Sequence, residues 1–181
     1  MASTLNLARE LLADELPRRW MHVQGVAHQA TRFHGVVPHD RLELLIASAY
    51  VHDIGYAAPI RQTGFHPLDG ARHLRRCGFD EALVCLVANH TCASIEAELR
   101  HLRPTLEQEF PLDPTLPHDE LTFCDLTTGP AGETVSVDDR LADIRRRYGP
   151  DDIVSRFIDR AEAQLRAAVG RAELTLHGTH V

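Results

Sequence analysis

Apolar side chains recur along this chain at helical spacing, and no stretch of useful length alternates apolar and polar residues as a half-buried strand would. The most continuous apolar stretch runs from Leu42 to Gly55, where apolar residues occupy all sides of a helix instead of a single stripe. A helix with that pattern is buried at the centre of a domain. We expect Asp40 to cap its N-terminus and Gly55 to end it.

The remaining apolar stripes predict further helices over about residues 4–15, 17–33, 66–77, 81–90, 94–101, 118–128, 138–148 and 151–169. Pro67 in a first turn and Asp80 before an apolar run are typical helix starts. Residues 103–117 contain four prolines and are expected to form a long loop, and residues 176–181 a frayed tail. The predicted fold class is therefore all-α, a single-domain helical bundle spanning residues 1–181.

Composition narrows the range of partners. The net charge of −7 argues against binding to nucleic acid or to an anionic membrane surface. All 19 basic residues are arginines, so a mechanism that uses a lysine nucleophile is excluded. No apolar run approaches the roughly 20 residues of a membrane span, the N-terminus does not resemble a signal peptide, and the four cysteines show no CxxC pairing. We therefore expect a cytoplasmic protein with reduced thiols.

Several titratable residues lie at helix ends or on apolar stripes, where they should face the core. These are His22, His52, Asp53, His66, His90 and Asp125. Taken alone, each is readily explained as a capped or ion-paired core residue, but so many imidazoles and carboxylates facing one core need a cation among them. Imidazole and carboxylate ligands together suit Fe, Mn, Co, Ni or Zn, so the sequence predicts a site for a divalent transition metal.

The order of these residues resembles the HD superfamily of metal-dependent phosphohydrolases, in its H…HD…H…H…D variant. The local sequences that carry the resemblance are MHVQGVA, ASAYVHDIG, FHPLDGA, ANHT and FCDLTTG. The resemblance covers about residues 18–128, and helices over residues 137–171 would complete an HD-type bundle. It implies a first metal held by His22, His52, Asp53 and Asp125. It also implies a second metal held by His66 and His90, with Asp53 bridging the two, although a one-ion site in which His66 and His90 bind substrate phosphate stays open.

The implied activity is hydrolysis of a phosphate ester, of a nucleotide or a related small molecule, by a metal-activated hydroxide. Asp53 and Arg18 are the expected catalytic residues. Arginine fits phosphate geometry, and the candidates close in sequence to the ligands are Arg18, Arg19, Arg61 and Arg72, with Arg18 preferred because it lies one turn before His22. Thr91 is expected to donate a hydrogen bond to the substrate.

Two other functions stay open. Some proteins with the same ligand order are di-iron oxygenases, and Tyr56, close to the His52–Asp53 pair, is a candidate contact in such an enzyme. A non-catalytic module that binds a nucleotide and regulates a partner is the other alternative. The expected partner is a small phosphorylated molecule, and a second copy of the chain is a candidate partner through the last helix.

Overall fold

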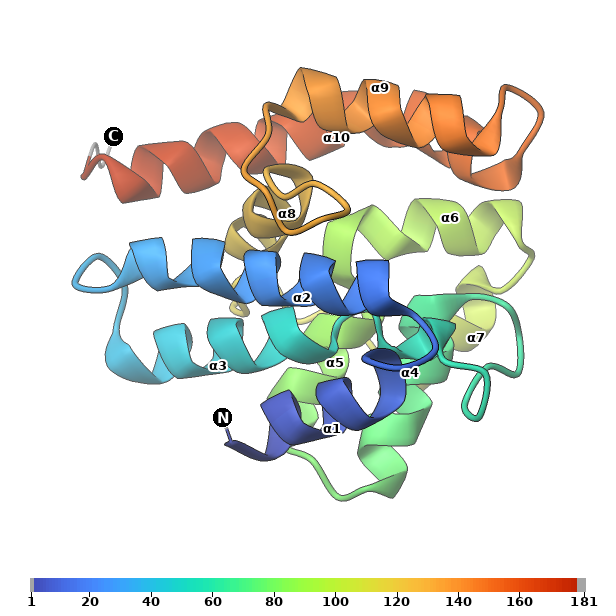
Figure 1. Ribbon diagram of the computed structural model, residues 1–181, viewed down its shortest axis with the longest axis horizontal. Coiled ribbons are helices and arrows are strands. Elements are labelled where there is room, and N and C mark those ends of the chain that lie inside the picture. The colour runs from blue at the N-terminus through green and yellow to red at the C-terminus, as the bar shows by residue number, and fades with distance from the viewer. Residues whose placement is uncertain (1, 179–181) are drawn as a thin grey trace.

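The computed structural model describes residues 2–178, which form an all-helical bundle (Figure 1). Its α-helices are α1 (Ala2–Leu12), α2 (Pro17–Ala30), α3 (His39–Val51), α4 (His66–Arg76), α5 (Glu81–Ala88), α6 (Ala93–Leu99), α7 (Arg103–Glu109), α8 (His118–Leu126), α9 (Val137–Tyr148) and α10 (Ile153–Leu176). Short 3-10 helices are η1 (Thr31–Phe33), η2 (Ile54–Tyr56) and η3 (His90–Cys92). Over the described range there is no strand, only an isolated bridge between Thr128 and Thr134. The prediction of an all-α single-domain fold is confirmed.

Helix α3 is the central element, as its apolar pattern predicts. It contributes side chains to two apolar clusters, one shared mainly with α1, α4 and α5 and one shared with α2, α8, α9 and α10. Leu45 and Ala49 face the second cluster and Val51 the first, and none of the three is exposed to solvent. In Figure 1, α2 runs beside α3, while α9 and α10 lie together as an outer layer, with α10 packed on α8 and α6.

The ends of α3 differ from the prediction. The residue before the helix is Pro38, and Asp40 lies inside the first turn, so the prediction of Asp40 as the N-cap is wrong. A carboxylate there still favours the helix, because it faces the positive end of the helix dipole. The helix also stops at Val51, ahead of Gly55, because Asp53 takes a non-helical conformation (φ −104°, ψ 5°) before η2 begins.

The predicted loop over residues 103–117 is partly wrong, because residues 103–109 form α7. Pro104 lies in the first turn of that helix, where its missing N–H removes no hydrogen bond and its fixed φ suits the helix. Leu106 and Phe110 are fully buried and anchor α7 to the core. Asp80, in contrast, caps α5 as predicted, accepting a hydrogen bond from the N–H of Ala82.

Helix α10 continues to Leu176, beyond its predicted end, and the last residues of the predicted tail, 179–181, lie outside the described range. None of the helices in the described part of the chain combines the length and the apolar character needed to cross a membrane.

Candidate metal centre

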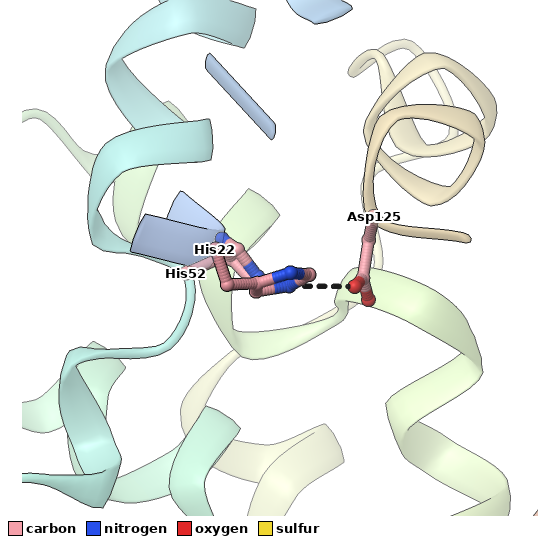
Figure 2. A group of neighbouring side chains, drawn as sticks. All are labelled: His22, His52 and Asp125. Atoms are coloured by element: carbon pink, nitrogen blue, oxygen red, sulfur yellow. Dashed lines mark hydrogen bonds and ion pairs between the residues drawn. The ribbon is translucent and has the colours of Figure 1, made fainter. Parts of the chain in front are cut away.

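The six predicted ligands come from five separate segments of the chain and meet at one place in the bundle. Their carriers are α2 (His22), the residues after α3 (His52 and Asp53), the start of α4 (His66), η3 (His90) and the last turn of α8 (Asp125). They form two groups, His22–His52–Asp125 and Asp53–His66–His90, and in each group one ligand atom per residue lies within 4.8 Å of the others. Figure 2 shows the imidazoles of His22 and His52 both directed at the Asp125 carboxylate.

Asp53 links the two groups. Its Oδ2 atom lies 3.4 Å from Nε2 of His52 and 3.9 Å from Nε2 of His22, on the side of the first group. Its Oδ1 atom lies 3.3 Å from Nε2 of His66, in the second group. The two oxygens of one carboxylate therefore face different histidine sets, which is the arrangement expected of a bridging ligand.

Backbone carbonyl groups fix which nitrogen of three histidines carries the proton. Nδ1 of His22 lies 3.1 Å from the carbonyl oxygen of Gly129, Nδ1 of His52 lies 2.8 Å from that of Ala49, and Nδ1 of His90 lies 2.6 Å from that of Val87. A carbonyl oxygen only accepts, so each Nδ1 must donate. In the neutral imidazoles, Nε2 is then a bare acceptor directed at the centre.

These inward-facing acceptors fit a bound cation. Nε2 of His52 is buried with no hydrogen-bond partner within residues 2–178, and Nε2 of His22 lies 3.1 Å from Oδ1 of Asp125, another acceptor. Lone pairs of nitrogen and carboxylate oxygen that converge in a buried site repel one another unless a positive ion lies between them. Imidazole nitrogen with carboxylate oxygen is also a donor set that divalent transition metals accept. The residues present therefore fit a metal.

Burial and charge set the protonation of the ligands. Burial lowers the pKa of His22, His66 and His90, in the last case to about 4, which favours the neutral imidazole that a metal requires. Burial is the largest single effect on the pKa of Asp53 and raises it, but the Arg19 guanidinium and the surrounding histidines together outweigh burial and hold the pKa below its ordinary value. Asp53 is therefore an ionised carboxylate in the folded protein.

Arg19 contacts a candidate ligand of the centre directly. Its Nη1 atom donates to Oδ2 of Asp53 at 2.5 Å, and its guanidinium carbon lies 4.1 Å from the centroid of the Tyr56 ring. The Tyr56 ring in turn stacks on the His66 imidazole, with centroids 4.1 Å apart and planes 17° from parallel. One side chain, Tyr56, thus orients both a cation and a ligand.

The position of His66 depends on two further residues. Asp69 is buried and accepts hydrogen bonds from the backbone N–H groups of residues 62–64, which fixes the loop leading into α4. Gly55 lies against the His66 backbone so closely that an added Cβ would stand 2.0 Å from the His66 carbonyl oxygen. Only glycine at this position lets α4 begin so close to the metal centre.

A cavity of about 70 Å³, called the central cavity below, opens beside the ligands. Asp53, His66, His90 and Asp125 line it, together with Arg19, Tyr56 and Thr91. Its opposite wall comes from α9 and α10, with Arg140 and Arg147 next to the apolar side chains Ile144, Phe157 and Ile158. The cavity therefore combines the candidate ligands, several cations and an apolar wall.

Of the residues predicted to bind substrate, some line the central cavity and others lie away from it. Thr91 lines the central cavity and donates its hydroxyl to Oδ2 of Asp125 at 2.9 Å. Arg61 is exposed, and Arg72 forms a two-point ion pair with Glu109, at 2.8 and 2.5 Å. Neither arginine lines the central cavity, so the prediction that they contact substrate is not supported.

Arg18, the preferred candidate, is exposed and lines a cavity next to the central one, whereas its neighbour Arg19 reaches Asp53. Arg140 was not predicted at all. Its exposed fraction is 6%, and its Nη2 atom lies 3.4 Å from Oδ1 of Asp125. A signal for it existed in the sequence, since Arg140 precedes Ile144 by one helical turn and so shares the buried face of α9.

Comparison with known proteins agrees with this geometry. The HD domain family matches residues 19–163, which is most of the chain and includes α9 and the first half of α10. The chain therefore belongs to the HD domain family, a superfamily of metal-dependent phosphohydrolases. No curated protein and no solved structure matches it.

Proposed function

We propose that the protein is a metal-dependent phosphohydrolase that cleaves a phosphate ester, of a nucleotide or a related small phosphorylated molecule. The observation that carries the proposal is the convergence of six ligands, in two groups joined by Asp53, on a cavity that Arg19, Arg140 and Arg147 also line. Ligands alone would suit several metal chemistries. Arginines at the same cavity favour a phosphate-bearing substrate.

Two ions are proposed. His22, His52 and Asp125 would hold one, His66 and His90 the other, with Asp53 contributing an oxygen to each. Bound ions of this kind supply a hydroxide nucleophile near neutral pH and positive charge for the phosphoryl oxygens. Iron, manganese, cobalt, nickel and zinc all suit these ligands.

Arg19 is the proposed phosphate-binding residue of the central cavity. A guanidinium has five N–H donors, and one of them is used on Asp53. The others are available to the non-bridging oxygens of a phosphate held next to Asp53. The ion pair with Asp53 and the Tyr56 ring hold the guanidinium in one orientation, so little conformational freedom is lost when the substrate binds.

Thr91 is proposed as a positioning residue. Its backbone has φ 49° and ψ 47°, a left-handed conformation that is costly for a β-branched residue. That conformation brings its hydroxyl to Oδ2 of Asp125, leaving Oδ1 toward His22 and Arg140. In this strained conformation the Thr91 hydroxyl occupies Oδ2 of Asp125, so Oδ1 is the oxygen left for the ligand group.

The test is phosphate release from a panel of nucleotides and small phosphate esters, with metal content measured on the same samples. We expect about two transition-metal ions per chain in the wild-type protein. In Asp53→Ala, both the ions and the activity should be lost, the latter by at least about 10²–10³-fold, since a preorganised electrostatic group of this kind is worth that much. Asp151→Ala, at an exposed aspartate outside both ligand groups, is the matched control and should change neither.

Retained turnover in Asp53→Ala would refute the proposal. Iron in the purified protein, together with oxygen consumption and no phosphate product, would favour the oxygenase alternative, in which Tyr56 against His66 becomes a contact of interest. Nucleotide binding without turnover in the presence of each of the five metals would favour the regulatory module.

A further inference from the structure

A second cavity, called the arginine cavity here, adjoins the metal centre. Its volume is about 120 Å³, and its lining is Arg18, Arg19, His22, Pro130, Arg140 and Arg147. Among the residues that the structure describes, no carboxylate side chain contributes to this lining. Four arginines around one small space are unusual in a chain whose net charge is −7, since mutual repulsion opposes such an arrangement.

Two of these arginines lack full compensation. Arg18 has no ion pair or side-chain hydrogen bond within residues 2–178. Arg140 is 94% buried, since its exposed fraction is 6%, and its Nε atom has no hydrogen-bond partner among the described residues. Its Nη2 atom makes long contacts, 3.4 Å to Oδ1 of Asp125 and 3.5 Å to Nε2 of His22. A buried guanidinium with an unpaired N–H is unfavourable unless an anion completes its surroundings.

The remaining two arginines are held by carboxylates that lie outside the lining. Arg19 is paired with Asp53, and Nε of Arg147 donates to Oδ2 of Asp143 at 2.8 Å. These ion pairs fix the positions of the guanidinium groups and leave their other N–H donors toward the cavity. The lining is therefore a preformed set of positively charged N–H donors.

The two cavities share a wall. Arg19, Arg140 and Arg147 line both the central cavity and the arginine cavity, so a molecule that occupies one is next to the other. One water molecule needs about 10–15 Å³ of such space, so about 120 Å³ has room for a phosphate group with its oxygens. Arginine donors match phosphate oxygens in pairs, which makes phosphate a better fit than a small halide or a single carboxylate.

We propose that the arginine cavity binds a second phosphate group of the substrate, which therefore belongs to the class of molecules that carry two phosphate groups, such as diphosphates or bisphosphates. One phosphate group lies at the ligands in the central cavity, and the other is held by Arg18 and Arg140. This inference rests on the proposed function, since it extends the substrate of the same site. It assigns Arg18 and Arg140 a role in specificity.

The experiment measures binding by calorimetry on the purified, metal-bearing protein, with two probes that are not hydrolysed. Methylenediphosphonate carries two phosphorus groups and methylphosphonate carries one. Arg18→Gln removes an exposed arginine of the lining, and Arg156→Gln removes an exposed arginine on α10 outside both cavities; neither arginine has an ion pair within the described part of the chain. Since both positions are exposed, neither substitution disturbs the packed core.

We expect Arg18→Gln to weaken methylenediphosphonate binding about tenfold, the effect of losing hydrogen bonds from a charged donor. Methylphosphonate binding should weaken by less than about twofold, as for a screened surface charge. Arg156→Gln should change neither. Arg140→Gln, at the buried position, should weaken methylenediphosphonate more than Arg18→Gln does.

The proposal is overturned if Arg18→Gln weakens both probes alike, or if its effect equals that of Arg156→Gln. Neither result depends on turnover, because the P–C–P bond of the probe is not cleaved. A protein that releases no phosphate from any ester yet shows the expected binding pattern would retain the arginine site and lose the proposed hydrolase function. Phosphate release without the expected binding pattern would retain the proposed hydrolase function and refute the arginine site.

Discussion

Replacing Gly55 with alanine tests how the second ligand group is positioned. The added Cβ would lie 2.0 Å from the carbonyl oxygen of His66, and within 2.8 Å of two more of its backbone atoms. Ordinary van der Waals contact begins at 3.4 Å, so the two backbone segments must separate by about 1.4 Å. The collision is with backbone atoms, so rotation of a side chain cannot relieve it.

The separation exceeds what a ligand site tolerates. A functional constellation must be held within about 0.5 Å of its productive geometry, so a shift of this size removes His66 from the ligand set. The three atoms nearest the added Cβ all belong to His66, and none belongs to the ligand group of His22, His52 and Asp125. We therefore expect metal content to fall from about two ions per chain to about one. Overpacking of this kind also costs about 1–3 kcal/mol, which lowers the Tm of a domain of this size by a few degrees.

The assay is elemental analysis of metal per chain, beside thermal unfolding followed by circular dichroism. Gly170→Ala is the matched control, because a Cβ added there meets no atom within 4 Å and the residue lies inside α10. It should keep both ions and gain about 0.5–1 kcal/mol of stability, since glycine weakens a helix interior. Gly55→Ala with two ions per chain and an unchanged Tm would refute the reasoning.

Three further outcomes are expected. Thr91→Val, which loses the hydroxyl on Asp125, should lower kcat/KM for phosphate release about tenfold, while Thr91→Ser keeps the hydrogen bond and should stay near the wild-type value. Arg72→Gln should leave KM unchanged and lower stability by no more than about 1 kcal/mol, because Arg72 is a partly exposed partner of Glu109. The hydrogen bond from Arg72 lowers the pKa of Glu109 below its ordinary value of 4.5. The Tm difference between wild type and Arg72→Gln should therefore be present at pH 7 and be lost as the pH falls below 4.5 through the lowered pKa. Iodoacetamide at pH 8 should label Cys77 first by mass spectrometry, because burial raises the pKa of the other three thiols.

The elements and candidate ligands could be predicted because each is marked locally in the sequence. His90 follows the apolar stripe of α5, and Asp125 lies one turn after the buried Leu121 in α8. Apolar periodicity predicts that such residues face the core, and this prediction does not require the position of the core to be known. The central place of α3 followed from the same kind of argument, since apolar residues surround it on all sides.

Other features depend on contacts between distant segments, which periodicity does not encode. Arg18 and Arg19 are adjacent near the start of α2, and only the position of Tyr56 and Asp53 decides that Arg19 enters the central cavity. Arg140 reaches the site because α9 packs beside α8. The turn between the two helices decides this packing, and the spacing of residues in the sequence does not predict the geometry of that turn. Pro104 is a loop signal in the sequence, although the same residue type equally starts a helix.

The three Nδ1–H groups donated to backbone carbonyls have a consequence for the amount of folded protein. They hold bare imidazole nitrogens toward one another and toward carboxylates, at a place where a bundle built only for stability would pack leucine and phenylalanine. Ions that bind the folded chain and not the unfolded chain relieve this local repulsion. By mass action, each tenfold rise of free ion above its dissociation constant adds about 1.4 kcal/mol to stability. The proposed metal site therefore predicts that the folded population of this protein rises with the metal supply of its surroundings.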